Sequence, residues 1–310
     1  RLLQSLTRGL EALDFLAART GKPVAGVIPH LDRLGIDDED SVSLDDKRGG
    51  GGEAAVDIAV LRLPKISNFT DFDSLAAEPD VRVRYVRAGE PLGRPDLIIL
   101  PGSKNTIEDL LWLRRQGHDR AILALAAAGT PVVGICGGYQ MLGREIRDPD
   151  HAESDMGRVD GLGLFDAVTT FAADKITRQV TAACAASPFL GIGLAAGDLA
   201  GYEIHMGRTE FSGPVVPAFT VTSRSGVAVR EDDGAVRADG LVMGTYIHGI
   251  FDNDVFRRAM VNALRSRKGL PPLAAAGDAR RRKEEAYDRL AAAVRANLDL
   301  DLVYRIMGTP

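Results

Sequence analysis

The sequence contains few cysteines, no long apolar run and no excess of basic charge. Only two of its 310 residues are cysteine, which excludes a fold held together by several disulfides and suits a reducing cytoplasm. No run of about 18 apolar residues occurs and no charged-then-apolar signal opens the chain, so we expect neither membrane insertion nor secretion. The 43 acidic and 38 basic residues give a formal net charge of −5, which does not favour nucleic acid. We therefore expect a cytoplasmic protein that binds neither nucleic acid nor membrane.

One of the two cysteines lies where a nucleophile is expected. Val132–Ile135 predicts a short buried strand and a helix is predicted from Gln140, so Cys136 falls at a sharp strand-to-helix turn. Glycines on both sides permit a strained turn, and a helix N-terminus favours a thiolate and offers backbone N–H groups to an oxyanion. The plainer interpretation of Cys136 is a small buried hydrophobe, which the glycines on both sides disfavour. Cys184, whose neighbours are alanines, lacks such surroundings and is expected to be structural.

A thiolate nucleophile needs a base, and the chain has five histidines. His248 ends the apolar run from Leu241, which places an imidazole at the C-terminal edge of a predicted sheet, where sites in open α/β folds gather. His205 is a second strand-end histidine, and either could serve the cysteine. The position opposite the cysteine turn favours His248. No role is assigned to His30, His118 or His151, which lie in predicted surface turns or helix ends.

Strands and helices alternate along much of the chain. Predicted strands cover Val56–Leu61, Val81–Val86, Leu97–Leu100 and Val132–Ile135, with a helix over Thr106–Arg115. This spacing predicts an α/β fold with a mainly parallel sheet and helices on both faces. The stretch from 165 to 230 is richer in β-branched residues and turn residues, so extra strands are expected there, some of them antiparallel.

Six segments together resemble class I glutamine amidotransferase domains, and specifically the cobyrinate and cobyric acid synthase branch. They are Gly134-Ile-Cys-Gly-Gly-Tyr-Gln, Thr245-Tyr-Ile-His-Gly-Ile-Phe, Lys65-Ile-Ser-Asn-Phe-Thr-Asp-Phe-Asp, Leu100-Pro-Gly-Ser-Lys-Asn-Thr, Tyr202-Glu-Ile-His-Met-Gly-Arg-Thr and Tyr287-Asp-Arg-Leu-Ala. The resemblance runs from about Arg1 to Met307. It implies a flavodoxin-like core of mainly parallel strands flanked by helices, together with a remnant of an N-terminal α/β synthetase domain.

The resemblance also implies a division of labour between glutamine hydrolysis and an ATP-dependent synthetase. Cys136 would attack the side-chain amide of glutamine, His248 would move the proton, and ammonia would leave a glutamyl thioester. Backbone N–H groups of Gly102 and Gly137 would meet the oxyanion, although Pro101-Gly-Ser also reads as a plain turn. In the full enzyme, ammonia would amidate the b, d, e and g carboxylates of a corrinoid, adenosylcobyrinic acid a,c-diamide, each activated by ATP.

Four further residues are candidates to bind glutamine. Arg158 and Arg208 could hold its carboxylate in a bidentate fork, although most arginines are merely solvated. Gln140 and His205 lie in the segments that carry the resemblance and are included for that reason.

One position departs from the wider superfamily. Typical class I amidotransferases carry His-Pro-Glu, whose glutamate orients the imidazole, but Gly249 follows the histidine here. The cobyric acid synthase branch is similar in lacking that glutamate. We consider Glu203 as a substitute orienting group, although it could equally be a surface carboxylate. The segment Lys65–Asp73 is motif-like, but its chemistry is unassigned, since Ser67, Asn68 and Thr70 also suit helix caps.

The organisation of the chain is expected to be bipartite. A helix from Arg1 to about Thr20 and a strand at Pro23–Ile28 indicate that the chain starts inside a domain, and Gly49–Gly52 reads as a flexible joint. We therefore assign residues 1–52 to a synthetase remnant with its linker and residues 53–310 to the amidotransferase domain. No Gly-x-x-x-x-Gly-Lys-Ser/Thr loop occurs, so this chain is expected to bind no cofactor, with ATP and Mg belonging to the missing synthetase part.

Three alternatives compete with this interpretation. A cell-wall precursor amidotransferase would share the cysteine turn and the histidine loop, but not the Lys65–Asp73 segment. The relative that makes the a,c-diamide is disfavoured by the Ser-Lys-Asn-Thr that follows Gly102. A non-catalytic docking module is the third, and the intact Cys136 and His248 argue against it.

Overall fold

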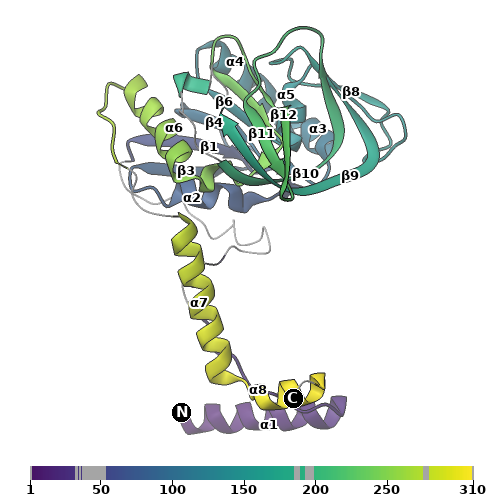
Figure 1. The fold of residues 1–310 in the computed structure, drawn as a ribbon, viewed down its shortest axis with the longest axis vertical. Helices are drawn as coiled ribbons and strands as arrows, with labels where there is room; N and C mark the ends of the chain where they lie inside the picture. Colours follow the sequence, from purple (N-terminus) through teal and green to yellow (C-terminus); the bar gives the residue numbers. More distant parts are fainter. Residues whose placement is uncertain are drawn as a thin grey trace. The chain divides into compact units, whose positions relative to one another are not determined.

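The computed structural model describes residues 2–31, 34, 36, 54–184, 189–192, 199–274 and 279–308, so the glycine-rich joint at 49–52 lies outside the described residues. The chain forms two compact units, one from residues 1–36 with 280–310 and the other from residues 37–279 (Figure 1). Within the described ranges, no helix is long and apolar enough to cross a membrane.

The smaller unit contains α1 (Leu2–Thr20), α7 (Ala279–Asn297) and α8 (Leu300–Met307). The strand predicted at Pro23–Ile28 is reduced to one isolated bridge between Gly26 and Leu298. The sequence analysis placed residues 280–310 with the amidotransferase domain, whereas the structure groups them with residues 1–36. The physical reason is a close backbone approach. A Cβ on Gly26 would lie 2.0 Å from the Asn297 carbonyl oxygen, and the Asp299 N–H donates to the Ala25 carbonyl oxygen (2.7 Å).

The larger unit is built on a six-stranded sheet in the order β13-β14-β6-β4-β1-β3. All neighbouring pairs are parallel except β13 with β14. The strands are β1 (Val56–Leu61), β3 (Val81–Val86), β4 (Leu97–Leu100), β6 (Val132–Ile135), β13 (Ala235–Val236) and β14 (Val242–Thr245). The first four coincide with the predicted strands. β1, β4 and β6 are near-continuous apolar runs typical of strands buried on both faces, whereas the edge strand β3 alternates apolar residues with arginines.

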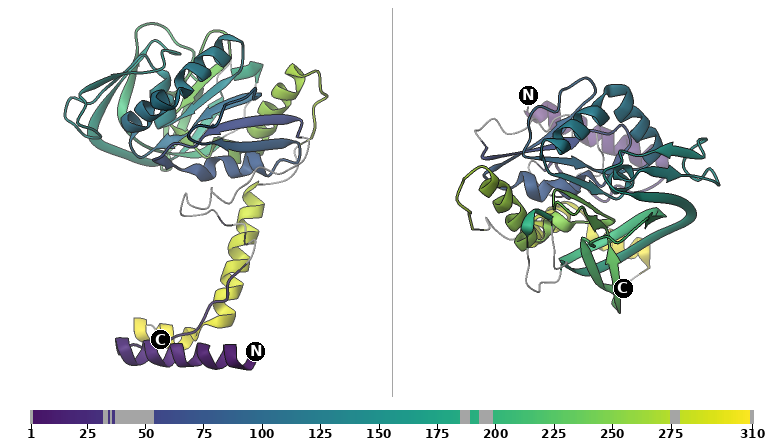
Figure 2. Two further views of the ribbon diagram at one scale, coloured as in Figure 1. Left: turned by 180° about the vertical axis from the view of Figure 1, so that it is seen from behind. Right: turned by 90° about the horizontal axis from the view of Figure 1, so that it is seen from above.

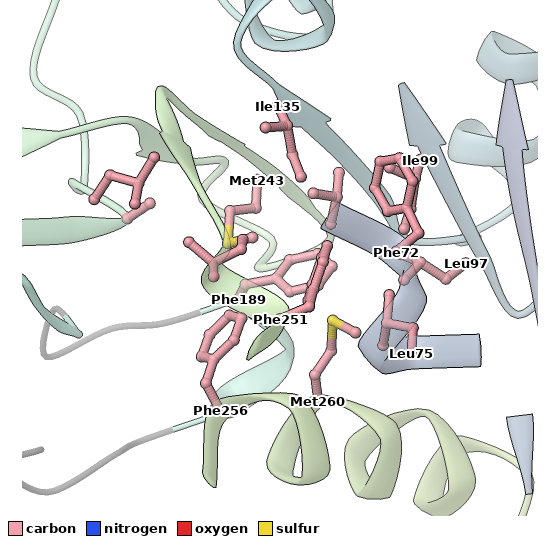
Figure 3. Close-up of a cluster of buried hydrophobic side chains, with 14 of the residues drawn as sticks. Phe72, Leu75, Leu97, Ile99, Ile135, Phe189, Met243, Phe251, Phe256 and Met260 are labelled. Carbon is pink, nitrogen blue, oxygen red and sulfur yellow. The ribbon is translucent and has the colours of Figure 1, made fainter. Parts of the chain in front are cut away.

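Alternate side chains of these strands enter two separate hydrophobic clusters. On one face, Ile58 and Ile99 pack in the cluster that contains Phe256 and Met260 of α6 (Asp254–Arg267), as Figure 3 shows in part. On the other face, Ile98 packs in the cluster formed with three helices, α3 (Thr106–Gln116), α4 (His118–Ala127) and α5 (Gly137–Leu142). The sheet is therefore covered by helices on both sides, as the alternating pattern predicted (Figures 1 and 2).

A second sheet has the order β12-β11-β9-β10-β15, with β7 pairing β8 and β9. Its strands are β7 (Glu145–Arg147), β8 (Arg158–Asp160), β9 (Ala167–Cys184), β10 (Leu199–Phe211), β11 (Phe219–Arg224), β12 (Val227–Asp233) and β15 (Ile247–His248). The pairs are antiparallel apart from β7 with β9, which confirms the extra strands expected in the middle of the chain. The chain passes from the first sheet to the second between Thr245 and Ile247, so His248 lies at their junction.

Short elements complete the larger unit. They are β2 (Ile66–Ser67), which pairs with β5 (Gly102–Ser103), the helix α2 (Asp73–Ala76) and the 3-10 turns η2 (Phe69–Phe72), η3 (Phe189–Gly191) and η4 (Ile250–Asp252). Two of them, β2 and η2, lie in the motif-like segment Lys65–Asp73, and α2 begins at its last residue.

Candidate active site around Cys136 and His248

Cys136 occupies the predicted turn between β6 and α5. Its backbone has φ 53° and ψ −111°, a region that non-glycine residues rarely adopt. Two hydrogen bonds fix the turn, since the Cys136 N–H donates to Thr245 O (2.8 Å) and the Gln140 N–H donates to Cys136 O (3.0 Å). Strain of this kind persists where the surroundings determine it, and it is common at reactive centres.

A glycine lets α5 begin directly against the sheet. A Cβ on Gly138 would lie 2.0 Å from the carbonyl oxygen of Leu100, which is backbone and cannot move aside. The first turn of α5 therefore packs against the end of β4 only because residue 138 has no side chain, and this contact sets the position of the Cys136 backbone.

His248 is completely buried and is held by a carboxylate that the sequence analysis did not identify. Its Nδ1–H donates to Asp71 Oδ2 (2.7 Å), and the Gly249 N–H donates to Asp71 Oδ1 (2.9 Å). Burial by itself lowers the pKa of His248, but the Asp71 carboxylate and the neighbouring Cys136 thiol outweigh it and raise the pKa to about 10. At neutral pH the imidazole is therefore protonated and lies beside the sulfur.

Asn68 approaches the other nitrogen of the same ring. Its Nδ2 lies 3.0 Å from His248 Nε2 and can donate to that nitrogen when the imidazole is neutral, and its own backbone is left-handed, with φ 50°. Asn68 stands at the N-cap position of η2, but its side chain makes no capping hydrogen bond, so the helix-cap interpretation of this residue is wrong. The Lys65–Asp73 segment thus contacts both nitrogens of the histidine.

Glu203 does not take the orienting position that the sequence analysis considered for it. Its two carboxylate oxygens accept from the Arg224 guanidinium at 3.0 and 3.1 Å. The register of β10 against β15 explains the difference, because Tyr202 pairs with His248 and Glu203 with Ile247. Successive side chains of a strand point to opposite faces, so Tyr202 rather than Glu203 stacks on the imidazole, with ring centroids 5.2 Å apart.

An apolar cluster behind the site holds the two halves together. Phe72 follows Asp71 in the chain, and its ring lies 6.3 Å from that of Phe251, three residues after His248. Both rings belong to the cluster drawn in Figure 3, where Leu75 and Met260 flank them. This packing places the segment that carries the carboxylate against the segment that carries the imidazole.

The loops that carry the two predicted oxyanion donors lie beside the cysteine and the histidine. A Cβ on Gly102 would be 3.2 Å from His248 Cε1, and one on Gly137 would be 3.0 Å from the Ser103 nitrogen. The Gly102 loop pairs with β2 in an antiparallel ladder, next to a hydrogen bond from the Lys104 N–H to Lys65 O (2.8 Å). Hydrogen-bonded and non-hydrogen-bonded pairs alternate along such a ladder, so Ser67 and Gly102 form its next hydrogen-bonded pair. An oxyanion role for the Gly102 N–H therefore requires this short ladder to open.

Asp109 ties that loop to the Lys65–Asp73 segment. Its Oδ2 accepts from the Ser103 hydroxyl (2.6 Å) and its Oδ1 from the Lys65 N–H (3.2 Å). Burial raises the pKa of Asp109 to about 6, against the opposing effect of these hydrogen bonds.

The other predicted substrate contacts have structural partners. The Gln140 side chain donates to Met206 O (2.8 Å) and accepts from the Thr106 hydroxyl (3.1 Å), and it is buried. His205 stacks on Tyr246 with ring centroids 3.9 Å apart, and its buried Nδ1 lacks a hydrogen-bond partner in the described structure. Burial lowers the pKa of His205.

The two candidate arginines lie on the surface. Arg158 is 67% exposed and pairs with Glu145 at 3.1 Å, while Arg208 is 84% exposed and pairs with Glu210 at 3.4 Å. Exposed ion pairs of this kind contribute little energy. Binding of the glutamine carboxylate by these arginines stays a prediction.

Strand β10 covers the nucleophile. The Cys136 thiol donates to the Ile204 carbonyl at 3.4 Å, and only 7% of the cysteine is exposed. Tyr202 of the same strand lies on the imidazole. Residues of β10 therefore lie directly against both the sulfur and the imidazole.

Comparisons with known proteins identify the family of the larger unit. Residues 57–256 match the CobB/CobQ-like glutamine amidotransferase domain. Among curated proteins, the cobyric acid synthase of Moorella thermoacetica is 52% identical over 301 residues, which cover 96% of this chain and 57% of that protein. The cobyric acid synthase of Pelotomaculum thermopropionicum is 51% identical over 305 residues, which cover 96% of this chain and 58% of that protein. The chain thus spans little more than half the length of these relatives.

Among solved structures, the chain resembles PurLQS from Thermotoga maritima with a TM-score of 0.51 and 19% sequence identity. The likeness covers 67% of this chain and 99% of that chain. At this identity it shows the fold alone, and it confirms the predicted α/β fold.

Proposed function

Because this chain belongs to the CobB/CobQ-like glutamine amidotransferase family, we propose that its larger unit releases ammonia from glutamine at Cys136. The observation that carries the proposal is the buried row of Cys136, His248 and Asp71 at the end of the parallel sheet. Nucleophile, base and orienting carboxylate stand in the order that covalent amide hydrolysis requires.

The chemistry follows from the charges of this row. The Cys136 thiolate attacks the side-chain amide carbon of glutamine, and backbone N–H groups of the Gly102 and Gly137 loops stabilise the oxyanion. Protonated His248 donates its Nε2 proton to the departing nitrogen, so ammonia leaves and a glutamyl thioester remains. Water then attacks the thioester with neutral His248 as the base, and glutamate leaves as the thiolate reforms.

Asp71 has two effects in this sequence of steps. Its contact with Nδ1 keeps a proton on that nitrogen, so that Nε2 is the atom that exchanges protons with the substrate. Its negative charge also stabilises the imidazolium before ammonia leaves. Asp71 thus takes the place of the glutamate that follows the histidine in typical class I amidotransferases.

The released ammonia is proposed to serve cobyric acid synthesis. In the complete protein, an ATP- and Mg-dependent synthetase part would activate the b, d, e and g carboxylates of adenosylcobyrinic acid a,c-diamide, and ammonia would capture each one. The support is the 51–52% identity to proteins named cobyric acid synthase over 96% of this chain. The corrinoid and nucleotide sites would lie in the synthetase part, and this chain supplies the ammonia.

Covalent labelling tests the glutaminase proposal. The chain is incubated with a diazo-ketone analogue of glutamine, and its intact mass is measured beside Cys136→Ala and the matched control Cys184→Ala. Stoichiometric labelling that only Cys136→Ala abolishes is the expected result. Labelling at Cys184, or an equal loss in both variants, would contradict the assignment. Absence of labelling in a folded chain would favour a non-catalytic docking module.

A further inference from the structure

Few of the smaller unit's side chains whose burial is described are buried. Among residues 11–31, 34, 36 and 281–308, Ala286 is the one buried residue, and neither of the two core clusters contains any of these residues. Large apolar side chains are exposed instead, namely Phe15 (66%), Leu16 (50%), Val27 (56%), Ile28 (44%), Ile306 (65%) and Met307 (65%), which we call the apolar surface of the small unit. Exposure on this scale is typical of a surface that another element covers.

The segment 23–28 is a strand without a sheet. Its sequence, Pro-Val-Ala-Gly-Val-Ile, has the continuous apolar character of a strand buried on both faces of a parallel sheet. In the described structure it forms one bridge, from Gly26 to Leu298, and its Val27 and Ile28 side chains remain exposed. An unpaired apolar strand is a template for pairing with further strands.

The C-terminal helix α8 is well formed although its apolar residues are uncovered. The Asp299 side chain caps its start by accepting from the Leu302 N–H (2.9 Å), and Gly308 ends it in the left-handed conformation with φ 70°. The Ile306 and Met307 side chains in its last turn are nonetheless exposed. Both ends of α8 are thus fixed by its own capping residues. Exposed apolar side chains on such a helix indicate a face that packs against another element.

Backbone contacts attach these C-terminal residues to the N-terminal segment. Asp299 N–H donates to Ala25 O (2.7 Å), and the Arg289 guanidinium donates to Leu34 O (2.6 Å). The chain therefore leaves the small unit near residue 36 and returns to it near residue 280. The larger unit is an insertion between two parts of the smaller one.

We propose that residues 280–308 belong to the synthetase module, and that the apolar surface of the small unit is covered by the additional region that the curated relatives possess. That occupant is favoured by length, since the chain accounts for 57–58% of those relatives and leaves room for a further α/β module. It is also favoured by the strand character of residues 23–28, which an adjoining parallel sheet would complete. Only the identification of this module as the synthetase rests on the proposed function.

A co-expression experiment tests the proposal. The whole chain is produced with an affinity tag, together with the unmatched region of the Moorella thermoacetica relative as a separate polypeptide, and the recovery of that region is measured. The test variant is Ile306→Asp with Met307→Asp, and the matched control is Val255→Asp, an equally exposed residue (69%) of α6 in the larger unit. We expect one-to-one recovery with the unaltered chain, a loss of roughly tenfold or more in the test variant and no loss in the control.

Three results would overturn the proposal. The first is that the unaltered chain captures none of the separate region. The second is that the double variant and a chain that ends before residue 280 both capture as much of it as the unaltered chain does. The third is that the chain associates with itself and the double variant does not. The last would identify a second copy as the occupant. Labelling of Cys136 by the glutamine analogue is measured in every variant. It should remain unchanged, so a failure of docking is distinguished from a failure of the glutaminase proposal.

Discussion

Replacing Asp71 by asparagine tests the reasoning about the site most directly. The substitution keeps the size of the side chain but removes the charge that faces the Nδ1 of His248 and the Gly249 N–H. The pKa of His248, raised from 6.5 to about 10 in the folded protein, is then governed by burial, which lowers it. The lost stabilisation of the imidazolium is up to about 5 kcal/mol, at about 1.4 kcal/mol for each pKa unit.

We expect Asp71→Asn to lower kcat for glutamine hydrolysis by about 10²- to 10⁴-fold with little change in KM, because the carboxylate acts through the histidine and not on the substrate. A second readout separates this role from a structural one. The pKa of the His248 imidazole, followed by NMR, should be about 10 in the unaltered chain, because the Asp71 carboxylate and the neighbouring Cys136 outweigh the effect of burial. In Asp71→Asn that pKa should fall, because burial lowers it and the carboxylate no longer opposes burial.

Asp71→Glu and Glu203→Gln serve as controls. The glutamate retains the charge and should restore part of kcat, whereas Glu203→Gln disturbs the pair with Arg224 and should alter stability more than kcat per folded molecule. An Asp71→Asn protein that folds normally, keeps kcat within about threefold and keeps the pKa of His248 near 10 would refute the assigned role.

Three further outcomes are expected. Gly138→Ala brings a Cβ to 2.0 Å from the Leu100 carbonyl oxygen, so it should lower the free energy of unfolding by about 2–4 kcal/mol or prevent folding, as a denaturant titration would reveal. The raised pKa of His248 contributes stability that is fully present below pH 6.5 and is lost as pH rises toward 10. Thermal unfolding midpoints should therefore fall between these pH values, and a midpoint that does not change with pH would contradict the buried ion pair. Arg158→Ala and Arg208→Ala remove only exposed ion pairs, so KM for glutamine should stay within about twofold in steady-state assays, and a tenfold rise would restore them as substrate contacts.

Local patterns in the sequence accounted for most of the first sheet and for the cysteine turn. The runs at Val56–Leu61, Leu97–Leu100 and Val132–Ile135 are apolar at nearly every position, and such strands can be located without their neighbours. The turn at Cys136 was predictable for the same reason, because its glycines and the flanking strand and helix are all local.

The orienting carboxylate was not predictable in this way. Asp71 and His248 are 177 residues apart, and no local pattern joins them. Two signals were available, namely a motif-like segment without assigned chemistry and a histidine without its usual glutamate, but pairing them required the fold. Glu203 was considered instead because it lies near His205 in sequence, and the strand register that directs it toward Arg224 becomes visible only in the sheet. Likewise, no local sequence signal joins Leu298 to Gly26, which it pairs with in the structure.

The contact of Asp71 with His248 and Gly249 has a consequence for how the protein is made. During synthesis the cysteine emerges long before the last strands, β14 and β15, leave the ribosome. Until then neither the His248 imidazole nor β14, whose Thr245 carbonyl accepts from the Cys136 N–H, is present. Contacts between residues so far apart in the sequence also form slowly, because a long loop must close first. A growing chain therefore lacks the base on which the proposed glutamine hydrolysis depends, so incomplete molecules should not consume glutamine.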